Sequence, residues 1–399
     1  MLAIHLQKLL LKKEKAKMGL RSTFLATAFT ASLLASTSHA IDTSAREAFM
    51  IDMKTGHILL EKNPDVSMPP ASMSKLMTLY LVFERLKDGR LTLDDKFTVS
   101  ERAWRKGGAA SGSSTMFLEP RQKVRVEDLI KGIIIQSGND ACIVVAEAVA
   151  GSEKNFAVEM TEKARELGME HSTFSNATGW PDPGQRMTPR DLSILAEALI
   201  TEFPEYYKFF AEKNFKYNGI RQSNRNPLLY KTMGADGLKT GHTSEAGYGL
   251  TSSAERDGRR LILVVNGLNS VRARSSESER LMEWGFREFN NYSLFKKGEE
   301  VTQAELWLSD KQSVALLIDQ DVEVTLPRKS RRKMKVSVQY DGPIPAPVKK
   351  GQELAKVVIT APDVKDIVIP LYAAEDAERL GFVGRLGAAL KSIIWGVTG

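Results

Sequence analysis

A serine and a lysine three residues apart are the first pair in the chain whose types could do chemistry. Ser72 and Lys75 lie in the stretch PPASMSKLMTLYLVFERLKDG (69–89), at the head of an apolar run. Residues i and i+3 share one face of a helix, so the Lys75 side-chain nitrogen can reach the Ser72 hydroxyl. The first turn of a helix also offers free N–H groups and a positive dipole end to an anion. A serine nucleophile needs both a base and an oxyanion stabiliser, so this pair could carry out acyl transfer.

The same spacing occurs three times, which makes it a weak signal by itself. Ser293 and Lys296 lie near an expected domain boundary, while Ser330 and Lys333 lie in the basic run RKSRRKMK, which we interpret as a solvated turn. Only the first pair begins a long helix, which the apolar spacing predicts over 72–88. Without further elements, an ordinary helix start would remain the simpler interpretation.

Two further short stretches carry polar groups between predicted elements. Ser137 and Asn139, in QSGND, separate two predicted helices; a hydroxyl there can relay a proton and an amide can hold a substrate amide, although a plain helix N-cap is the simpler alternative. Lys239 and Thr240, in GLKTGHT, precede a predicted strand, whose free edge could pair with an extended peptide while the two side chains bind a carboxylate. A second KTGH, at 54–57, is predicted to be a hairpin turn.

The three elements together, in this order, match the S-x-x-K, S-D-N and K-T-G set of penicillin-binding proteins and class A β-lactamases, although the second element here is SGN rather than SDN. With PPASMSKLMT, SGNDAC, GLKTGHT and WGF, the chain resembles the low-molecular-mass penicillin-binding proteins of the penicillin-binding protein 5 type, which are D-alanyl-D-alanine carboxypeptidases. The element pattern predicts an α+β fold with helices packed on a mainly antiparallel sheet. The resemblance identifies this as a DD-peptidase/β-lactamase-like domain.

The resemblance implies a role for each residue of the first two elements. Ser72 would be the acylated nucleophile and Lys75 its general base. Ser137 would relay a proton toward the leaving amine, and Asn139 would hold the peptide side of the substrate. Lys75 must be partly neutral for this, and burial and the nearby cation Lys239 would both lower its pKa.

The remaining implied roles concern the carboxylate and the oxyanion. Lys239 and Thr240 would bind the terminal carboxylate of the substrate, and the backbone N–H groups of Ser72 and His242 would form the oxyanion hole. Arg274, in VRARSSESER, stands where the family places a carboxylate-binding arginine, a match weakened by a second arginine two residues earlier.

The implied reaction is removal of the terminal D-Ala from peptidoglycan stem pentapeptides through a Ser72 acyl-enzyme, without metal or other cofactor. β-Lactam antibiotics would acylate the same serine. A DD-endopeptidase on the same fold and a class A-like β-lactamase are the alternatives; the β-lactamase would need a glutamate base that the segment 174–191 does not contain. An idle scaffold protein is disfavoured because all the catalytic side chains are present.

The chain divides into parts with different patterns of apolar and polar residues. We expect the catalytic domain over 41–292, a small all-β stalk domain over 295–373 and a basic amphipathic helix over 375–399. Apolar residues at helical spacing interleave with basic ones in this last segment, which favours a helix in a membrane interface over one packed on its own protein.

The N-terminus predicts export. Residues 1–40 carry a basic start, a short apolar stretch and a final SHA with small Ser38 and Ala40, which is typical of a signal peptide cleaved after Ala40. The apolar run is short for a spanning helix of about 20 residues. Met18 is an alternative start. The resulting expectation is a periplasmic protein attached to the outer face of the inner membrane. The net charge of +7 suits an anionic surface; nucleic acid is excluded as a partner by compartment.

Overall fold

The computed structural model describes residues 41–231, 234–362 and 364–384. The expected signal peptide and residues 385–399 of the expected C-terminal helix therefore lie outside the described residues. At the start of that expected helix the prediction is wrong: residues 375–381 are not helical, and Ala377 and Arg379 form bridges with Val348 and Ser309. Within the described ranges, no helix combines the length and apolar character that crossing a bilayer requires.

The catalytic part is built on an antiparallel sheet that joins the two ends of this part of the chain. Among the described residues this sheet has five strands in the order β2-β1-β9-β8-β7. Its strands are β1 (Glu47–Asp52), β2 (Ile58–Lys62), β7 (Ala235–Thr243), β8 (Gly247–Arg256) and β9 (Arg259–Leu268). The second KTGH stretch forms the turn between β1 and β2, as predicted. The KTGH stretch at 239–242 lies on β7, at the edge of the sheet.

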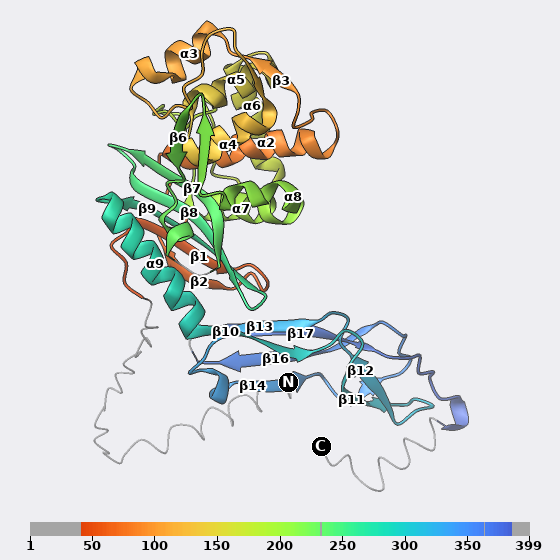
Figure 1. The fold of residues 1–399 in the computed structure, drawn as a ribbon. Coiled ribbons are helices and arrows are strands. Elements are labelled where there is room, and N and C mark those ends of the chain that lie inside the picture. The colour runs from red at the N-terminus through yellow and green to blue at the C-terminus, as the bar shows by residue number, and fades with distance from the viewer. Residues whose placement is uncertain (1–40, 232–233, 363, 385–399) are drawn as a thin grey trace, which may run out of the picture. The chain divides into compact units, whose positions relative to one another are not determined.

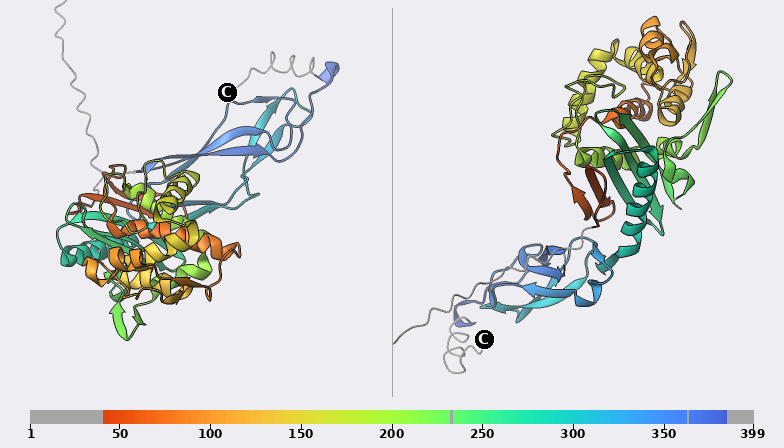
Figure 2. Two further views of the ribbon diagram at one scale, coloured as in Figure 1. Left: turned by 90° about the horizontal axis from the view of Figure 1, so that it is seen from above. Right: turned by 90° about the vertical axis from the view of Figure 1, so that its left-hand side faces the viewer.

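Alternate residues of the strands face two different helical layers. Met50 of β1 and Leu263 of β9 are paired and pack with α9 (Val271–Glu288), whereas the next pair, Phe49 and Val264, joins the core of the helical cluster. Helix α7 (Pro189–Glu202) contacts the sheet on that second side. Figures 1 and 2 show α9 on one face of the sheet and the helical cluster on the other. This is the predicted α+β architecture.

The helical cluster surrounds a central helix, α2 (Lys75–Lys87). Its apolar residues Leu76, Leu79 and Phe83 recur at helical spacing and are fully buried. The helix begins three residues later than expected, because Ala71–Ser74 form a 3-10 turn. The other helices are α3 (Glu101–Gly107), α4 (Val126–Lys131), α5 (Asn139–Ala150), α6 (Glu153–Glu166) and α8 (Pro204–Tyr207). Two small hairpins join the cluster: β3 (Lys96–Thr98) with β4 (Lys123–Arg125), and β5 (Asn214–Tyr217) with β6 (Ile220–Ser223).

The C-terminal part is all β and has its own apolar core, which includes Leu316, Val357 and Leu371. In the described residues, a six-stranded sheet has the order β14-β16-β17-β12-β11-β15, and β10 pairs with β13. Its strands are β10 (Phe289–Phe295), β11 (Glu300–Trp307), β12 (Ser313–Leu317), β13 (Val322–Pro327), β14 (Lys335–Gln339), β15 (Ile344–Pro345), β16 (Glu353–Ala361) and β17 (Val364–Ala373).

The start of this β-rich part differs from the sequence prediction. Residues 289–292 were assigned to the catalytic domain, but they belong to β10 and pair with β13. The β-rich part therefore starts at Phe289 rather than at 295, because the pairing of β10 with β13 begins there; Tyr292 and Leu294 of β10 pack against its apolar core. The basic run that holds Ser330 and Lys333 forms a short turn between β13 and β14, as interpreted from the sequence.

A buried ion pair fixes the end of α9 to the sheet. Arg259 Nε lies 2.7 Å from Asp52 Oδ2, and the two side chains are 9% and 0% exposed. Arg259 Nη1 also donates to the carbonyls of Gly285 and Phe289, at 3.1 and 2.9 Å. Arg259 thereby satisfies carbonyl groups that the end of the helix leaves without intrahelical partners.

We expect Arg259→Ala to lower the free energy of unfolding by about 3–5 kcal/mol, because Asp52 would keep a buried, unpaired charge. Urea denaturation of the mature chain measures this. Arg287→Ala is the matched control: its ion pair with Glu288 is exposed, so its loss should cost at most about 1 kcal/mol. Equal losses in the two variants would contradict the assignment.

Candidate active site

Ser72 and Lys75 form a hydrogen-bonded pair at the head of α2. Lys75 Nζ lies 2.8 Å from Ser72 Oγ and 2.5 Å from the carbonyl oxygen of Thr178. The lysine is fully buried, whereas Ser72 is partly exposed and lines a cleft. The 3-10 turn before α2 carries the serine hydroxyl toward this cleft while the lysine stays beneath it. The arrangement gives a nucleophile in contact with a base.

The surroundings of Lys75 make its amine a weaker base than an exposed lysine. Its pKa is lowered to about 8, chiefly by burial; the positive charge of Arg225 acts in the same direction, and Cys142 and Asp140 act in the opposite direction. A lysine with this pKa is partly neutral at neutral pH and can accept the Ser72 proton.

Lys239, the cation expected from the sequence to lower the pKa of Lys75, has a lowered pKa of its own. Burial lowers its pKa well below the ordinary value, and repulsion from Lys75 adds to this. Arg225, which has no motif to mark it, is a cation whose charge lowers the pKa of Lys75.

Ser137 and Asn139 reach the site through an irregular connection. Helix α4 continues as a π-turn (Gly132–Gln136), and Ser137 then adopts a left-handed conformation with φ of 59°, which is uncommon and costly for a non-glycine residue. Helix α5 is preceded by Gly138 and has no side-chain cap, so the simple N-cap interpretation of this stretch is wrong. Ser137 Oγ and Asn139 Oδ1 are buried without a hydrogen-bond partner among the described residues. Both atoms are thus available to a ligand.

Asp140 anchors the neighbouring segment that lines the cleft. Its carboxylate accepts hydrogen bonds from the Thr115 hydroxyl at 2.5 Å and from the N–H groups of Met116 and Leu118 at 3.0 and 3.1 Å. These bonds fix the chain that follows Ser114, and Ser114 Oγ accepts a hydrogen bond from Arg225 Nη1 at 2.6 Å.

Strand β7 forms the opposite wall. Lys239 and Thr240 are buried on this strand, and the Lys239 Nζ donates to the Thr240 carbonyl at 3.2 Å. His242 lines the cleft and stacks on Tyr248, with ring centroids 3.9 Å apart. A Cβ on Gly241 would lie 2.8 Å from the Pro70 carbonyl oxygen, so only glycine lets β7 approach the turn that carries Ser72 this closely.

Arg274 lies behind this wall on α9. It is 6% exposed, its guanidinium lies 5.7 Å from the centre of the Tyr248 ring, and its Nε has no partner among the described residues. Burial lowers its pKa to about 10, with a further contribution from Arg225. Arg225 thus contributes to the lowered pKa values of Lys75, Lys239 and Arg274, and the positive charges of Arg225 and Arg274 make a site suited to a carboxylate.

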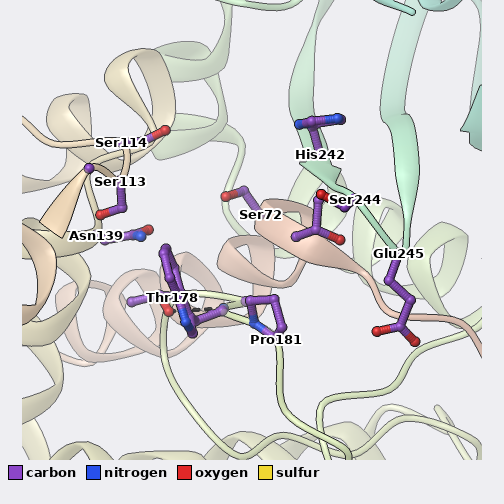
Figure 3. Close-up of a pocket in the computed structure, with 13 residues that line it drawn as sticks. Ser72, Ser113, Ser114, Asn139, Thr178, Pro181, His242, Ser244 and Glu245 are labelled. Carbon is purple, nitrogen blue, oxygen red and sulfur yellow. Dashed lines mark hydrogen bonds between the residues drawn. The ribbon is translucent and has the colours of Figure 1, made fainter. Parts of the chain in front are cut away.

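A cleft of about 610 Å³ lies over Ser72. Figure 3 shows the Ser72 hydroxyl between Asn139 of α5 and His242 of β7. The cleft is lined by Ser72, Gly112, Ser113, Ser114, Asn139, Thr178, Gly179, Trp180, Pro181, His242, Thr243, Ser244 and Glu245. The structure thus brings Ser72, Asn139 and His242 to one cleft, with Lys75, Lys239 and Thr240 buried in its walls.

The floor of the cleft is a loop held in place by Asn176. Its Oδ1 accepts hydrogen bonds from the N–H groups of Thr178, Gly179 and Trp180 at 3.1, 2.8 and 3.1 Å. A Cβ on Gly179 would lie 1.9 Å from the Ala71 carbonyl oxygen, so the loop packs closely on the turn that carries Ser72. What it presents to Lys75 is the Thr178 carbonyl, not a carboxylate.

Sequence reasoning missed Arg225, Asp140 and Asn176. Asp140 could have been found, because it follows Asn139 directly in SGND. Asn176 and Arg225 carry no local signal: their partners are backbone groups of an irregular loop and a serine 111 residues away.

Two family models match the chain. The model described as D-alanyl-D-alanine carboxypeptidase, of the peptidase S11 type, matches residues 34–270. The model described as the penicillin-binding protein 5 C-terminal domain matches residues 289–379. This second match starts at the first residue of β10.

Comparison with individual proteins and solved structures points to the same family. The chain is 41% identical over 366 residues to the D-alanyl-D-alanine carboxypeptidase DacC of Escherichia coli, covering 91% of each chain. It is 38% identical to DacA of Haemophilus influenzae, covering 86% of this chain and 88% of that one. The structure is similar to that of penicillin-binding protein 5 from Haemophilus influenzae, with a TM-score of 0.74, 37% identity and coverage of 85% and 98%. An ampicillin-bound structure of penicillin-binding protein D2 from Listeria monocytogenes is also similar, with a TM-score of 0.54, 32% identity and coverage of 62% and 98%.

Proposed function

Because the chain belongs to the D-alanyl-D-alanine carboxypeptidase family of serine peptidases, we propose that it removes the terminal D-Ala from peptidoglycan stem pentapeptides. The observation that carries this proposal is the contact of 2.8 Å between Lys75 Nζ and Ser72 Oγ in an open cleft. A buried amine with a lowered pKa in contact with an accessible hydroxyl is what serine acyl transfer requires.

In the proposed acylation, Ser72 Oγ attacks the carbonyl carbon of the penultimate D-Ala and gives its proton to the neutral amine of Lys75. The N–H groups of Ser72 and His242 stabilise the oxyanion. As the tetrahedral intermediate collapses, a proton reaches the leaving amine through Ser137, and D-Ala departs. Water then attacks the ester, with Lys75 again as base, and frees a shortened stem and Ser72.

Binding of the substrate follows from the two walls of the cleft. The free edge of β7 pairs with the extended peptide, and the Asn139 amide holds it on the acyl side. The terminal carboxylate lies toward Lys239 and Thr240, with Arg274 adding charge from behind. A carboxylate that enters there favours the charged form of Lys239, whose proton the free site binds weakly.

β-Lactams are proposed to acylate Ser72, in keeping with the ampicillin-bound relative. An efficient β-lactamase is not favoured, because the loop over 174–191 offers Lys75 a carbonyl and contains no glutamate to activate water. DD-endopeptidase activity remains the alternative on the same fold.

The proposed function is tested with three substrates: a peptide ending in Lys-D-Ala-D-Ala, a cross-linked muropeptide dimer and a penicillin. D-Ala release from the first, with little cleavage of the dimer and a long-lived penicillin adduct, supports the carboxypeptidase. Dimer cleavage without D-Ala release would establish the endopeptidase instead, and rapid multiple turnover of penicillin the β-lactamase.

We further propose export and membrane attachment, which rest on the sequence of residues 1–40 and 375–399. The mature chain would begin at Ile41 and lie in the periplasm on the outer face of the inner membrane. Fractionation of cells that express the full chain, with mass spectrometry of the N-terminus, tests this. A truncation after Leu380, which keeps the pairing of Ala377 and Arg379 with the β-rich part, should move the protein from the membrane fraction to the soluble one.

A further inference from the structure

A basic turn on the β-rich part takes no part in the proposed reaction. It connects β13 to the first residue of β14 over residues 328–335, with the sequence RKSRRKMK, which contains no acidic residue. Arg332, Lys333 and Lys335 are exposed there, and none of the three forms an ion pair with a residue that the structure describes. Their positive charges are therefore available to an anionic partner.

The basic turn is held in one shape before any partner binds. Ser330 is buried and its N–H donates to the Pro327 carbonyl at 2.9 Å, while Lys333 N donates to the Ser330 carbonyl at 3.0 Å. The Arg331 guanidinium lies over the ring of Tyr292 on β10, 5.1 Å from its centre. A surface whose backbone is already fixed loses less entropy when a ligand binds.

The positive surface continues into a cavity at the end of α9. This cavity has a volume of about 380 Å³, and Arg328 of the basic turn and Arg287 of α9 both line it. Asp257 and Glu283 also line it, but Glu283 already accepts a hydrogen bond from Arg256 Nη1 at 2.9 Å. Arg328 is exposed and forms no ion pair within the described ranges of the chain. Because a guanidinium can bind a carboxylate through two parallel hydrogen bonds, Arg328 extends the basic turn as a carboxylate site.

The position of the basic turn argues against a membrane as its partner. Arg328 N donates to the Glu288 carbonyl at 2.8 Å, so the turn lies where α9 meets β10. The chain leaves toward the expected membrane segment directly after β11, where Leu380 N donates to the Leu308 carbonyl at 2.8 Å. Figure 1 shows these two places at opposite ends of the β-rich part. The seven residues of β10 alone span about 20 Å, whereas exposed charges act over only about 8 Å at physiological ionic strength.

We propose that the basic turn is a second, non-catalytic contact with peptidoglycan, which binds carboxylates of stem peptides that are not in the Ser72 cleft. The proposal rests on the proposed function, which places the chain beside this polymer. Each stem peptide ends in a carboxylate, so a strand with many stems is a polyanion that complements a row of lysine and arginine side chains. Holding one part of the polymer raises the effective concentration of its other stems at the cleft.

The test is co-sedimentation of the full chain, kept in a non-ionic detergent, with purified peptidoglycan sacculi. Excess penicillin is added first to block the cleft, so that the remaining binding reports a contact elsewhere on the chain. Sacculi whose carboxylates have been coupled to methylamine provide the same polymer without these charges. We expect the chain to bind them at least about tenfold more weakly than unmodified sacculi, and high salt to weaken binding to the unmodified form because the contact is exposed.

A triple variant, Arg332→Glu with Lys333→Glu and Lys335→Glu, reverses the charge of the turn. It should bind unmodified sacculi about tenfold more weakly, because each exposed ion pair contributes little and three are reversed together. The control variant makes the same change in net charge at exposed lysines elsewhere on the chain, and should bind like the wild type: Lys123→Glu, Lys154→Glu and Lys208→Glu. Penicillin acylation and D-Ala release from a short peptide should be the same in both variants, which also shows that both are folded.

Several results would overturn the proposal. One is the absence of binding by the penicillin-blocked wild type, and another is binding that methylamine coupling does not change. Equal losses in the two triple variants would attribute binding to net charge rather than to the turn. A defect confined to phosphatidylglycerol vesicles would assign the turn to lipid headgroups instead. If no peptide is cleaved but binding to sacculi still depends on the turn, the carboxypeptidase proposal fails and this contact stands.

Discussion

Ser72→Ala is expected to abolish both D-Ala release and the covalent penicillin adduct. We expect activity to fall by at least about 10³-fold, because removing a nucleophile leaves only binding and oxyanion stabilisation. The fold should survive, since Ser72 is partly exposed and its hydroxyl is bonded to Lys75 Nζ, which retains the Thr178 carbonyl as a partner. Intact-mass spectrometry with a penicillin measures the adduct, and a D-Ala assay measures release.

Ser293→Ala is the matched control for this result. Ser293 also precedes a lysine by three residues, but it is exposed on β10, so its replacement should change neither readout. An adduct that persists in Ser72→Ala would place the nucleophile elsewhere and remove the basis of the mechanism.

Local motifs were sufficient to predict the residues that meet in the cleft. The three elements are short, and each lies where one secondary structure element meets another, so their positions follow from the order of helices and strands. The start of the central helix was less predictable. The sequence predicts a helix from Ser72, but Ala71–Ser74 form a 3-10 turn, on which Gly179 and Gly241 pack closely. Those contacts come from segments more than 100 residues away.

The electrostatics of the site could not be read from the sequence. Burial is the main cause that lowers the pKa of both Lys75 and Lys239, and Arg225, a cation that lowers both pKa values, lies in a loop without a motif. The start of the β-rich part was misplaced for a related reason: residues 289–292 continue a helical pattern, and only pairing with β13 makes them a strand.

The second large effect concerns Lys75. Lys75→Arg keeps the positive charge and much of the length of the side chain, but a guanidinium does not lose its proton in the accessible pH range. If Lys75 acts as a base, acylation by penicillin should fall by about 10²–10⁴-fold. Lys87→Arg, an exposed position on the same helix, should leave the rate unchanged. A variant with arginine at 75 that acylates normally would show that the ammonium only holds Ser72 in place.

The pH dependence of acylation separates the base from a merely positioning role. The neutral amine is the active form, so the rate should rise with pH, about tenfold per unit on the acid side, and level off above the Lys75 pKa of about 8. Arg225→Ala removes a positive charge that lowers the pKa of Lys75. The pKa therefore rises, and the rising limb of the pH–rate profile moves to higher pH. The variant should be slow at pH 7 and regain most of the wild-type rate near pH 10. Arg225→Lys keeps the charge and should keep the limb near that of the wild type; a uniform loss in Arg225→Ala at every pH would assign Arg225 to substrate binding instead.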